Sequence, residues 1–419
     1  MTYEYPLIIM FIIGYLAITI EHSIKINKAA IALFTAVVCW AIYFLSHQHA
    51  MSGQMTTLQH YISEISQIVF FLIGAMTIVE TVDSHGGFTI VTDLMKTRSK
   101  RSLLWIIGFV TFFLSAILDN LTTTIVMVSL LRKLIPDANE RKVLGAMVVI
   151  SANAGGAWTP IGDVTTTMLW INGQISTLNI MKALFLPSLA CLIIPLLWET
   201  KNLKGKYPKL TASQKTIVEP KGTLIFFLGL AALVAVPIIK VLTGLPPFMG
   251  MFIGLAILWI VTDFLHVKDD KRNHLRVPHI LTKIDISGAL FFFGILLAIK
   301  SLEISGLLNQ IATWLNQNLP SLDIVALVIG LISAVIDNVP LVAATQGMYS
   351  LADHPMDSRL WELIAYCAGT GGSILIIGSA AGVALMGLEK IHFAWYFKRI
   401  SFVALLGYLA GFGVYYFVN

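Results

Sequence analysis

Two copies of one polar motif stand inside long apolar runs of the sequence. The first copy is Asp119-Asn120, and the second is Asp337-Asn338. A carboxylate at membrane depth is costly, and such a side chain is usually kept there for a function. Because the two copies occupy matching places in the chain, they predict a duplicated ion site inside a membrane protein.

A second kind of interruption follows each motif. Gly155-Gly156, followed by Pro160, interrupts one apolar run, and Gly371-Gly372 interrupts another. These residues unwind a helix, and unwound backbone in a membrane is tolerated only where it is buried in protein or lines a cavity. Its carbonyl groups can then coordinate a cation, helped by the negative end of the preceding half-helix. We therefore expect a broken helix after each motif.

The side chains around these interruptions supply many oxygen atoms. The residues that we expect to bind the ion and the proton are Asp119, Asn120, Asn153, Thr159, Asp163, Thr165, Thr166, Ser333, Asp337, Asn338, Thr370 and Ser373. The residues that we expect to support them are Ser115, Thr122, Gly155, Gly156, Pro160, Gly371, Gly372 and Ser379. The set contains no His or Cys. Oxygen ligands alone suit a hard cation such as Na⁺, whereas imidazole and thiolate suit zinc or copper.

The two halves of this set are unequal. Asp163 corresponds to Ser379 and Asn153 to Gly369, so the first half supplies more ligands. A buried carboxylate holds a proton more readily than one in water. A sodium ion and a proton would therefore compete for it, and this competition is sufficient for exchange across a membrane. Neither interruption contains Arg or Lys, which disfavours an anionic substrate.

The composition indicates a polytopic helical membrane protein. Of 419 residues, 57% are hydrophobic and 12% are charged, and the mean hydropathy is +0.82. Soluble domains carry roughly twice that share of charge. The net charge of +5 comes from basic residues between apolar runs, so it does not indicate nucleic-acid binding. The cysteines Cys39, Cys191 and Cys367 have no metal-binding spacing.

The polar motifs belong to an internal repeat, in which Gly86 matches Gly306 and Gly155 matches Gly371. We expect an all-α fold of two inverted-topology repeats, each with a re-entrant helical hairpin and a broken transmembrane helix. The first repeat, 1–200, would comprise scaffold spans (1–82), an interfacial helix (86–97), a hairpin (102–135), a broken helix (143–170) and a span (183–198). After a cytoplasmic linker (201–221), the second repeat, 222–419, would comprise scaffold spans (222–300), an interfacial helix (304–319), a hairpin (322–351), a broken helix (361–388) and a span (400–418).

The basic residues decide between a hairpin and a crossing helix at each Asp-Asn motif. With two hairpins, every Lys and Arg except Lys182, Lys240, Lys300 and Arg359 falls on one side of the membrane. Cytoplasmic loops are enriched in Lys and Arg. We therefore predict ten full spans plus two hairpins whose tips meet near the midplane, with both termini outside, in the periplasm.

At these motifs the sequence resembles the NhaD-type sodium/proton antiporters, within a wider ion-transporter superfamily. The resemblance is carried by residues 118–123, 151–156 and 159–166, and it extends to 337–340 and 369–373. It implies a secondary active transporter, not an enzyme, that exports Na⁺ and Li⁺ in exchange for H⁺ without a cofactor. It also implies alkaline activation, elevator-type alternating access, a homodimer, a role in pH homeostasis and a bacterial inner membrane.

Other interpretations of the same residues stay open. Asp119 and Asp337 could simply cap the returning helices of the hairpins. Asp163 could complement the dipole of the half-helix that begins after Pro160. Transport of a carboxylate or an oxyanion is the alternative function. Against it, dicarboxylate carriers have Ser-Asn-Thr at their hairpin tips, where this chain has Asp-Asn. An intramembrane aspartyl protease with Asp119 and Asp337 as its dyad is less favoured.

Overall fold

The computed structural model describes residues 4–46, 51–95, 97, 99–203, 205–207, 219, 221–267 and 270–419. Within this part of the chain every regular element is helical, and the β contact recorded is an isolated bridge between Ser99 and Lys206. The prediction of an all-helical fold is thus confirmed for these residues. Of the predicted elements, residues 1–3, 47–50, 268 and 269 of the scaffold spans, residue 96 of the first interfacial helix, and residues 204, 208–218 and 220 of the linker lie outside them.

Long apolar helices account for much of the chain. An apolar helix of about 20 residues can cross a membrane. Seven helices of the described residues are long and apolar enough to do so. They are α3 (Lys28–Ser46), α4 (Met51–Ser84), α10 (Thr177–Asn202), α11 (Gly222–Thr243), α12 (Pro247–His266), α14 (Ile286–Ile304) and the segment Phe393–Val418. That segment contains α20 (Phe393–Tyr396), the π-helical turn η3 (Phe397–Ser401) and α21 (Phe402–Val418). The protein is therefore a multi-pass membrane protein.

Shorter helices lie between these spans. They are α1 (Glu4–Thr19), α6 (Lys100–Ser115), α7 (Asn120–Leu134), α8 (Ala138–Gly156), α9 (Val164–Ile171), α15 (Leu307–Asn318), α16 (Leu322–Ile332), α17 (Asn338–Met348), α18 (Arg359–Gly371) and α19 (Ala380–Glu389). The connecting segments hold α2 (Glu21–Ile24), α5 (Thr89–Leu94), η2 (Asp270–Leu275) and α13 (Val277–Ile280). The helices α15 and α16 meet at 118°, and counting them as one bent span raises the number of candidate spans in the described residues to eight.

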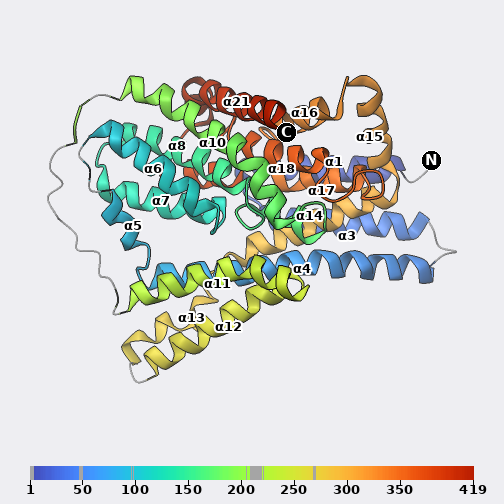
Figure 1. The fold of residues 1–419 in the computed structure, drawn as a ribbon. Coiled ribbons are helices and arrows are strands. Elements are labelled where there is room, and N and C mark those ends of the chain that lie inside the picture. Colours follow the sequence, from blue (N-terminus) through green and yellow to red (C-terminus); the bar gives the residue numbers. More distant parts are fainter. Residues whose placement is uncertain are drawn as a thin grey trace.

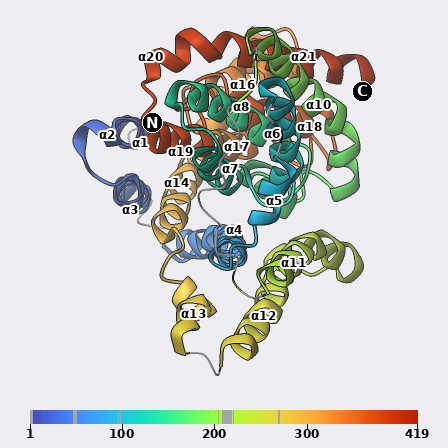
Figure 2. The ribbon, with the colours of Figure 1, turned by 90° about the vertical axis from the view of Figure 1, so that its left-hand side faces the viewer.

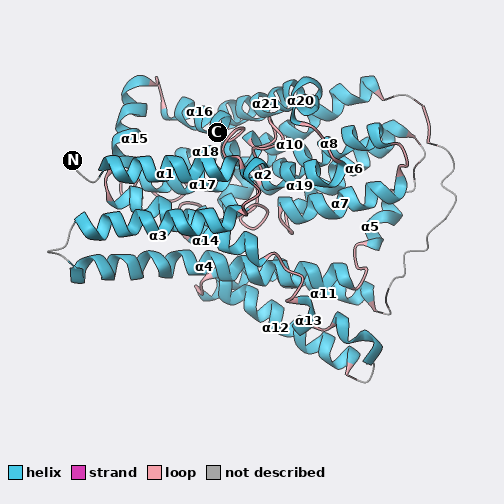
Figure 3. Cartoon of the chain, turned by 180° about the vertical axis from the view of Figure 1, so that it is seen from behind, coloured by secondary structure: helices cyan, strands magenta, loops and turns pink. Residues whose placement is uncertain are grey.

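The helices pack as two groups (Figure 1). In what we call the long-helix group, α3 packs against α1 and α14, and α12 packs against α4 and α11. In the broken-helix group, which holds α6–α10 and α16–α21, α10 packs against α21, α6 against α8, and α16 against α18. In Figure 2, α12 and α13 lie at the edge of the molecule, away from the broken-helix group. Figure 3 shows α1 and α3 side by side from behind.

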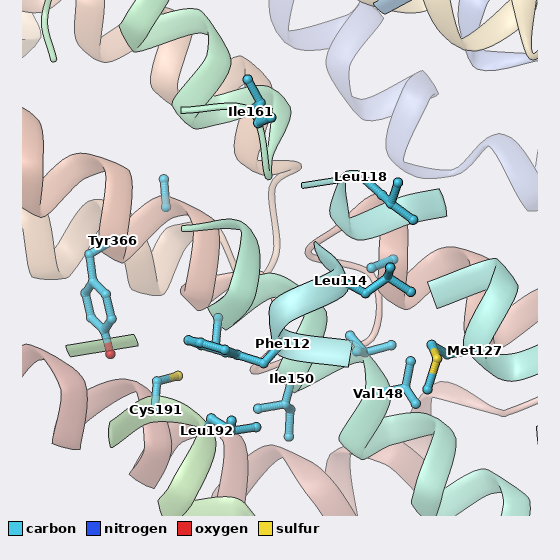
Figure 4. Close-up of a cluster of buried hydrophobic side chains, with 14 of the residues drawn as sticks. Phe112, Leu114, Leu118, Met127, Val148, Ile150, Ile161, Cys191, Leu192 and Tyr366 are labelled. Carbon is cyan, nitrogen blue, oxygen red and sulfur yellow. The ribbon is translucent and has the colours of Figure 1, made fainter. Parts of the chain in front are cut away.

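Close side-chain packing holds the broken-helix group together. Phe112, Ile150, Leu192 and Tyr366, from α6, α8, α10 and α18, are fully buried in one apolar cluster (Figure 4). Lipid tails are as apolar as these side chains, so helices in a membrane associate through tight packing and hydrogen bonds more than through the hydrophobic effect. The site described below is therefore built on a densely packed support.

Ion pairs between buried carboxylates and partly exposed arginines join the ends of the same helices. Glu389 of α19 accepts hydrogen bonds from Arg132 of α7 at 2.9 Å and from Arg141 of α8 at 3.1 Å. Glu199 of α10 accepts two bonds of 2.6 Å from the guanidinium of Arg399 in η3. A buried carboxylate without its partner would be strongly destabilising, so these pairs fix which helix ends can lie together.

Candidate ion-binding site

Four helices of the broken-helix group begin at a break and carry a polar cap. Asp119, Asp163, Asp337 and Ser379 cap α7, α9, α17 and α19, and each accepts a backbone N–H from within the next three residues, at 2.9, 2.9, 3.2 and 3.2 Å. Asp119 and Asp337 thus make the cap bonds of the capping interpretation, and Asp163 makes the same kind of bond at the start of α9. A neutral hydroxyl serves equally well as a cap, as Ser379 does, so capping alone does not explain three carboxylates.

The two Asp-Asn breaks are fastened to the following helices by matching bonds. The hydroxyl of Ser115 donates to the carbonyl of Ala152 at 2.7 Å, and the hydroxyl of Ser333 donates to the carbonyl of Ala368 at 2.9 Å. Each bond joins the end of the helix that precedes the motif, α6 or α16, to α8 or α18. The hydroxyls of Ser115, a predicted supporting residue, and Ser333, a predicted ligand, thus make the same kind of contact, and their roles in ion binding stay predictions.

Glycines allow the helices to touch at these points. A Cβ on Gly155 would lie 2.2 Å from the carbonyl oxygen of Phe112, and one on Gly371 would lie 2.0 Å from that of Gly330. No side chain fits at such distances. The backbones of α6 and α8, and likewise those of α16 and α18, are therefore in direct contact at matching places.

Asp163 is the centre of the buried polar residues. Its side chain is 1% exposed, and its Oδ1 accepts the N–H and the hydroxyl of Thr165, both at 2.9 Å. Its Oδ2 accepts the amide of Asn120 at 2.5 Å and that of Asn338 at 3.5 Å. One carboxylate is therefore reached by the asparagines of both motifs, as the sequence predicts for a shared site.

Asn153 connects this carboxylate to the second broken helix. Its Oδ1 accepts a bond of 3.0 Å from Asn120, and its Nδ2 donates to the hydroxyls of Ser373 at 2.8 Å and Ser379 at 3.0 Å. We call the connected residues the Asp163 cluster: Asn120, Asn153, Asp163, Thr165, Asn338, Ser373 and Ser379. All of them are buried, and together they come from all four breaks.

Asp119 and Asp337 lie beside the cluster and not within it. Both are half-buried, and with Asp163 they line one cavity of about 220 Å³. The carboxylate of Asp119 accepts the hydroxyl of Thr122 at 2.6 Å. Among the described residues, no group of three or more His, Cys, Asp and Glu side chains is close enough to hold a metal ion. The three carboxylates thus share a cavity but do not form one coordination cage.

The two motif aspartates, Asp119 and Asp337, differ in backbone conformation. Asp119 has φ 144° and ψ 160°, a region almost confined to glycine, and a side chain there costs about 1–3 kcal/mol. Asp337 has φ −49° and ψ 135°, which is relaxed. Strain of this kind persists only where the surroundings impose it, and it is concentrated at functional sites.

Several predicted ligands are engaged elsewhere. The hydroxyls of Thr159, Thr166 and Thr370 each donate to a backbone carbonyl, at 2.6, 2.9 and 2.6 Å. The carbonyl of Pro160 accepts the hydroxyl of Thr167 at 3.0 Å. The hydroxyls of Thr159 and Thr370 thus lie outside the Asp163 cluster, whereas that of Thr166 bonds to the backbone carbonyl of Asp163 and not to its carboxylate. The part of all three in ion binding stays a prediction.

The cavity also reaches residues that the sequence-based set omits. It extends from the aspartates to Glu80 and Asp83 at the end of α4, and to Lys283 and Asp285 before α14. Residues three apart lie on the same side of a helix, so the spacing of Glu80 and Asp83 at the end of an apolar run is the signal that could have identified them. These charged groups surround one end of the cavity.

Comparison with known proteins identifies the family to which the chain belongs. The family model described as "Citrate transporter" matches residues 8–361. "Sodium/proton antiporter 1" and "Sodium/proton antiporter 2" of Arabidopsis thaliana are 56% and 52% identical, each over 98% of this chain and over 72% and 99% of their own lengths. "Na(+)/H(+) antiporter NhaD" of Vibrio cholerae is 30% identical over 100% of this chain and 92% of its own. The chain therefore belongs to the citrate-transporter family of membrane transporters and, within it, to the NhaD-type sodium/proton antiporters.

Proposed function

We propose that this protein exchanges Na⁺, and also Li⁺, for H⁺ across a membrane at the Asp163 cluster. The observation that carries the proposal is the single buried carboxylate that receives amides from both Asp-Asn motifs. The names of its relatives, which are sodium/proton antiporters, support the same substrates. Asp119 and Asp337, on the same cavity, would pass the cation or the proton to and from this carboxylate.

Exchange follows from the chemistry of a carboxylate. Ionised Asp163 only accepts hydrogen bonds, whereas its protonated form carries a donor. The ionised form attracts a cation, and the amide and hydroxyl oxygens of Asn153, Thr165 and Ser373 could complete its shell. A proton on the carboxylate removes that charge and releases the cation. The two ions therefore use the site in turn, and neither needs a cofactor.

The helix pattern supports ten spans and two hairpins. Seven long spans, the shorter apolar α1, and the two interrupted pairs α8–α9 and α18–α19 give ten crossings. The pairs α6–α7 and α16–α17 are then the re-entrant hairpins. The matching caps, hydroxyl bonds and glycine contacts support two repeats, and an odd number of spans in each makes them inverted.

We infer from its lining that the cavity opens toward one side of the membrane. Glu80, Asp83 and Lys283 lie at its charged end, on the side that collects most of the Lys and Arg. By the positive-inside rule that side is cytoplasmic, so this conformation is open inward and both termini lie outside. A bacterial inner membrane and a homodimer remain part of the proposal through the family resemblance.

Alternating access requires the site to face the other side as well. The Asp163 cluster lies wholly in the broken-helix group, and the long-helix group supplies the other wall of the cavity through α4 and α14. Movement of the first group against the second, as in an elevator, would carry the site across without dismantling it.

Ion flux into proteoliposomes tests the proposal. In vesicles with a preformed pH gradient reported by a quenched dye, Na⁺ or Li⁺ should restore the fluorescence, and K⁺ or choline should not. Exchange with K⁺ alone, or the absence of any response to Na⁺ in vesicles that retain the gradient, would contradict it.

Carboxylate transport is the second candidate, because the matching family model is described as a citrate transporter. The described lining of the cavity contains one basic residue, Lys283, beside several carboxylates. That charge balance repels a carboxylate substrate and attracts a cation. Addition of citrate to the same vesicles should leave the gradient unchanged, and labelled citrate should not accumulate.

A further inference from the structure

A lysine on a span of the long-helix group contacts the half-helix that carries Asp163. The Nζ of Lys240, near the end of α11, donates to the backbone carbonyl of Trp170 at 2.6 Å. The same Nζ lies 4.1 Å from the centroid of the Trp170 ring. One side chain thus makes both a charged hydrogen bond and a cation–π contact between the two helix groups.

The position of Trp170 connects this contact to Asp163 through one short helix. Trp170 lies in the last turn of α9, an eight-residue helix whose first cap is Asp163. The carbonyl end of a helix carries partial negative charge and unpaired acceptors, which a cation satisfies. Lys240 therefore binds the C-terminal end of α9 and Asp163 caps its N-terminal end, so a displacement of Trp170 would also displace the site.

Trp170 is also tied to the rest of the broken-helix group. Its ring is 1% exposed, and its Nε1 donates to the hydroxyl of Thr177 at 3.0 Å. Just beyond it, Asn172 and Gln174 bond to Gln346 of α17, at 3.3 and 3.0 Å. Lys240 thus contacts the broken-helix group near the place where α9, α10 and α17 are joined by hydrogen bonds.

The contact lies away from the open end of the cavity. Lys240 does not line the cavity, whose charged end is formed by α4 and the segment before α14. It is also one of the few basic residues that the topology assigns to the outer side. The contact therefore closes the side opposite to the opening.

We propose that Lys240 is a positioning residue that holds the inward-open state, and that each transport cycle must break its contact with Trp170. This inference rests on the proposed exchange function and adds the element that stabilises one of its two states. A contact present in only one state shifts the equilibrium by its own differential free energy.

Side-dependent kinetics test this inference. In Lys240→Met the inward-open fraction falls, so the apparent KM for Na⁺ at the cytoplasmic face should rise about fivefold or more. Lys240→Arg keeps a cation and a donor and should stay near the wild type. Lys182→Met is the matched control, since Lys182 is exposed and also lies on the outer side. Equal KM values in Lys240→Met and Lys182→Met would overturn the inference.

Thiol labelling gives a readout that does not depend on flux. Ile125 lines the cavity and is 42% exposed, whereas the three native cysteines are buried. In an Ile125→Cys background, a hydrophilic thiol reagent should react more slowly when Lys240→Met is added, by the factor that KM rises. An unchanged labelling rate would contradict the inference alone, whereas a wild type without exchange would contradict the proposed function.

Discussion

Among single residues, the three aspartates differ sharply in their surroundings. Asp163 is buried and receives amides from both motifs, whereas Asp119 and Asp337 face the cavity and mainly cap their helices. Desolvation favours the neutral form of a carboxylate, so a buried carboxylate that accepts amide N–H groups is suited to alternate between a proton and a cation. Asp119 and Asp337, which face the cavity, are suited to pass ions between the cavity and Asp163.

We expect Asp163→Asn to abolish exchange. The amide retains a cap acceptor for α9 but can neither bind a proton nor balance a cation. Dye-reported Na⁺/H⁺ exchange in proteoliposomes should fall to the level of empty vesicles. Asp353→Asn, at an exposed loop residue, should exchange at the wild-type rate. Activity in Asp163→Asn above a tenth of the wild-type rate would move the proton-binding role elsewhere.

Strain at Asp119 predicts opposite effects on stability and function. Asp119→Gly removes an unfavourable backbone conformation worth about 1–3 kcal/mol, while a glycine cap costs only about a few tenths of a kcal/mol. The Tm in detergent should therefore rise while exchange is impaired. Asp337→Gly has no strain to relieve and should not raise the Tm. A lower Tm in Asp119→Gly than in Asp337→Gly would contradict this account.

Among the elements, the four helix breaks define the site. Each break ends one helix and lets the cap of the next lie against the others, and the glycine contacts bring these backbones together. The site is thus a junction of helix ends, where peptide groups without a helical partner are available. This is why polar side chains can gather at membrane depth.

We expect Gly155→Ala to destabilise the junction. Its Cβ would overlap the carbonyl oxygen of Phe112, which is backbone and cannot turn away, and forced overpacking costs about 1–3 kcal/mol. Gly387→Ala is the control, because nothing lies within 4 Å of a Cβ at that helical position. Thermal unfolding should show a lower Tm for the first variant and an unchanged or higher Tm for the second.

The breaks could be predicted from sequence because Gly, Pro and Asp-Asn interrupt otherwise apolar runs, and these signals are local. The hydrogen-bond partners of the hydroxyl groups could not be predicted from sequence. Thr159 and Ser333 bond to carbonyls far along the chain, and residue type alone does not say whether a hydroxyl faces a backbone group or a cavity. The contact of Lys240 with Trp170 escaped prediction for the same reason, since it joins two helix groups.

For the whole molecule, the arrangement of two helix groups around one cavity underlies the proposed mechanism. The broken-helix group holds every residue of the Asp163 cluster, and the long-helix group supplies Glu80 and Asp83 at the charged end of the cavity. The presence of several membrane-crossing helices follows from hydropathy, but the packing of the groups depends on helix contacts that hydropathy does not encode.

Competition for one site predicts how pH changes transport. When the pH falls, protons occupy the carboxylate more often, so the apparent KM for Na⁺ at the same face should increase, while saturating Na⁺ should restore the rate. Initial rates at several pH values and Na⁺ concentrations measure this. A maximal rate that falls at low pH with an unchanged KM would indicate a regulatory proton and not a competing one.

Proton release on cation binding tests the central claim most directly. Purified protein in weakly buffered detergent solution, near the pH at which the site is half-protonated, should acidify the medium when Na⁺ or Li⁺ is added, and choline should have no effect. Asp163→Asn should release no protons, while Asp353→Asn should behave as the wild type. Undiminished release from Asp163→Asn, or none from the wild type at any pH at which it exchanges ions, would contradict the claim that a cation and a proton share this carboxylate.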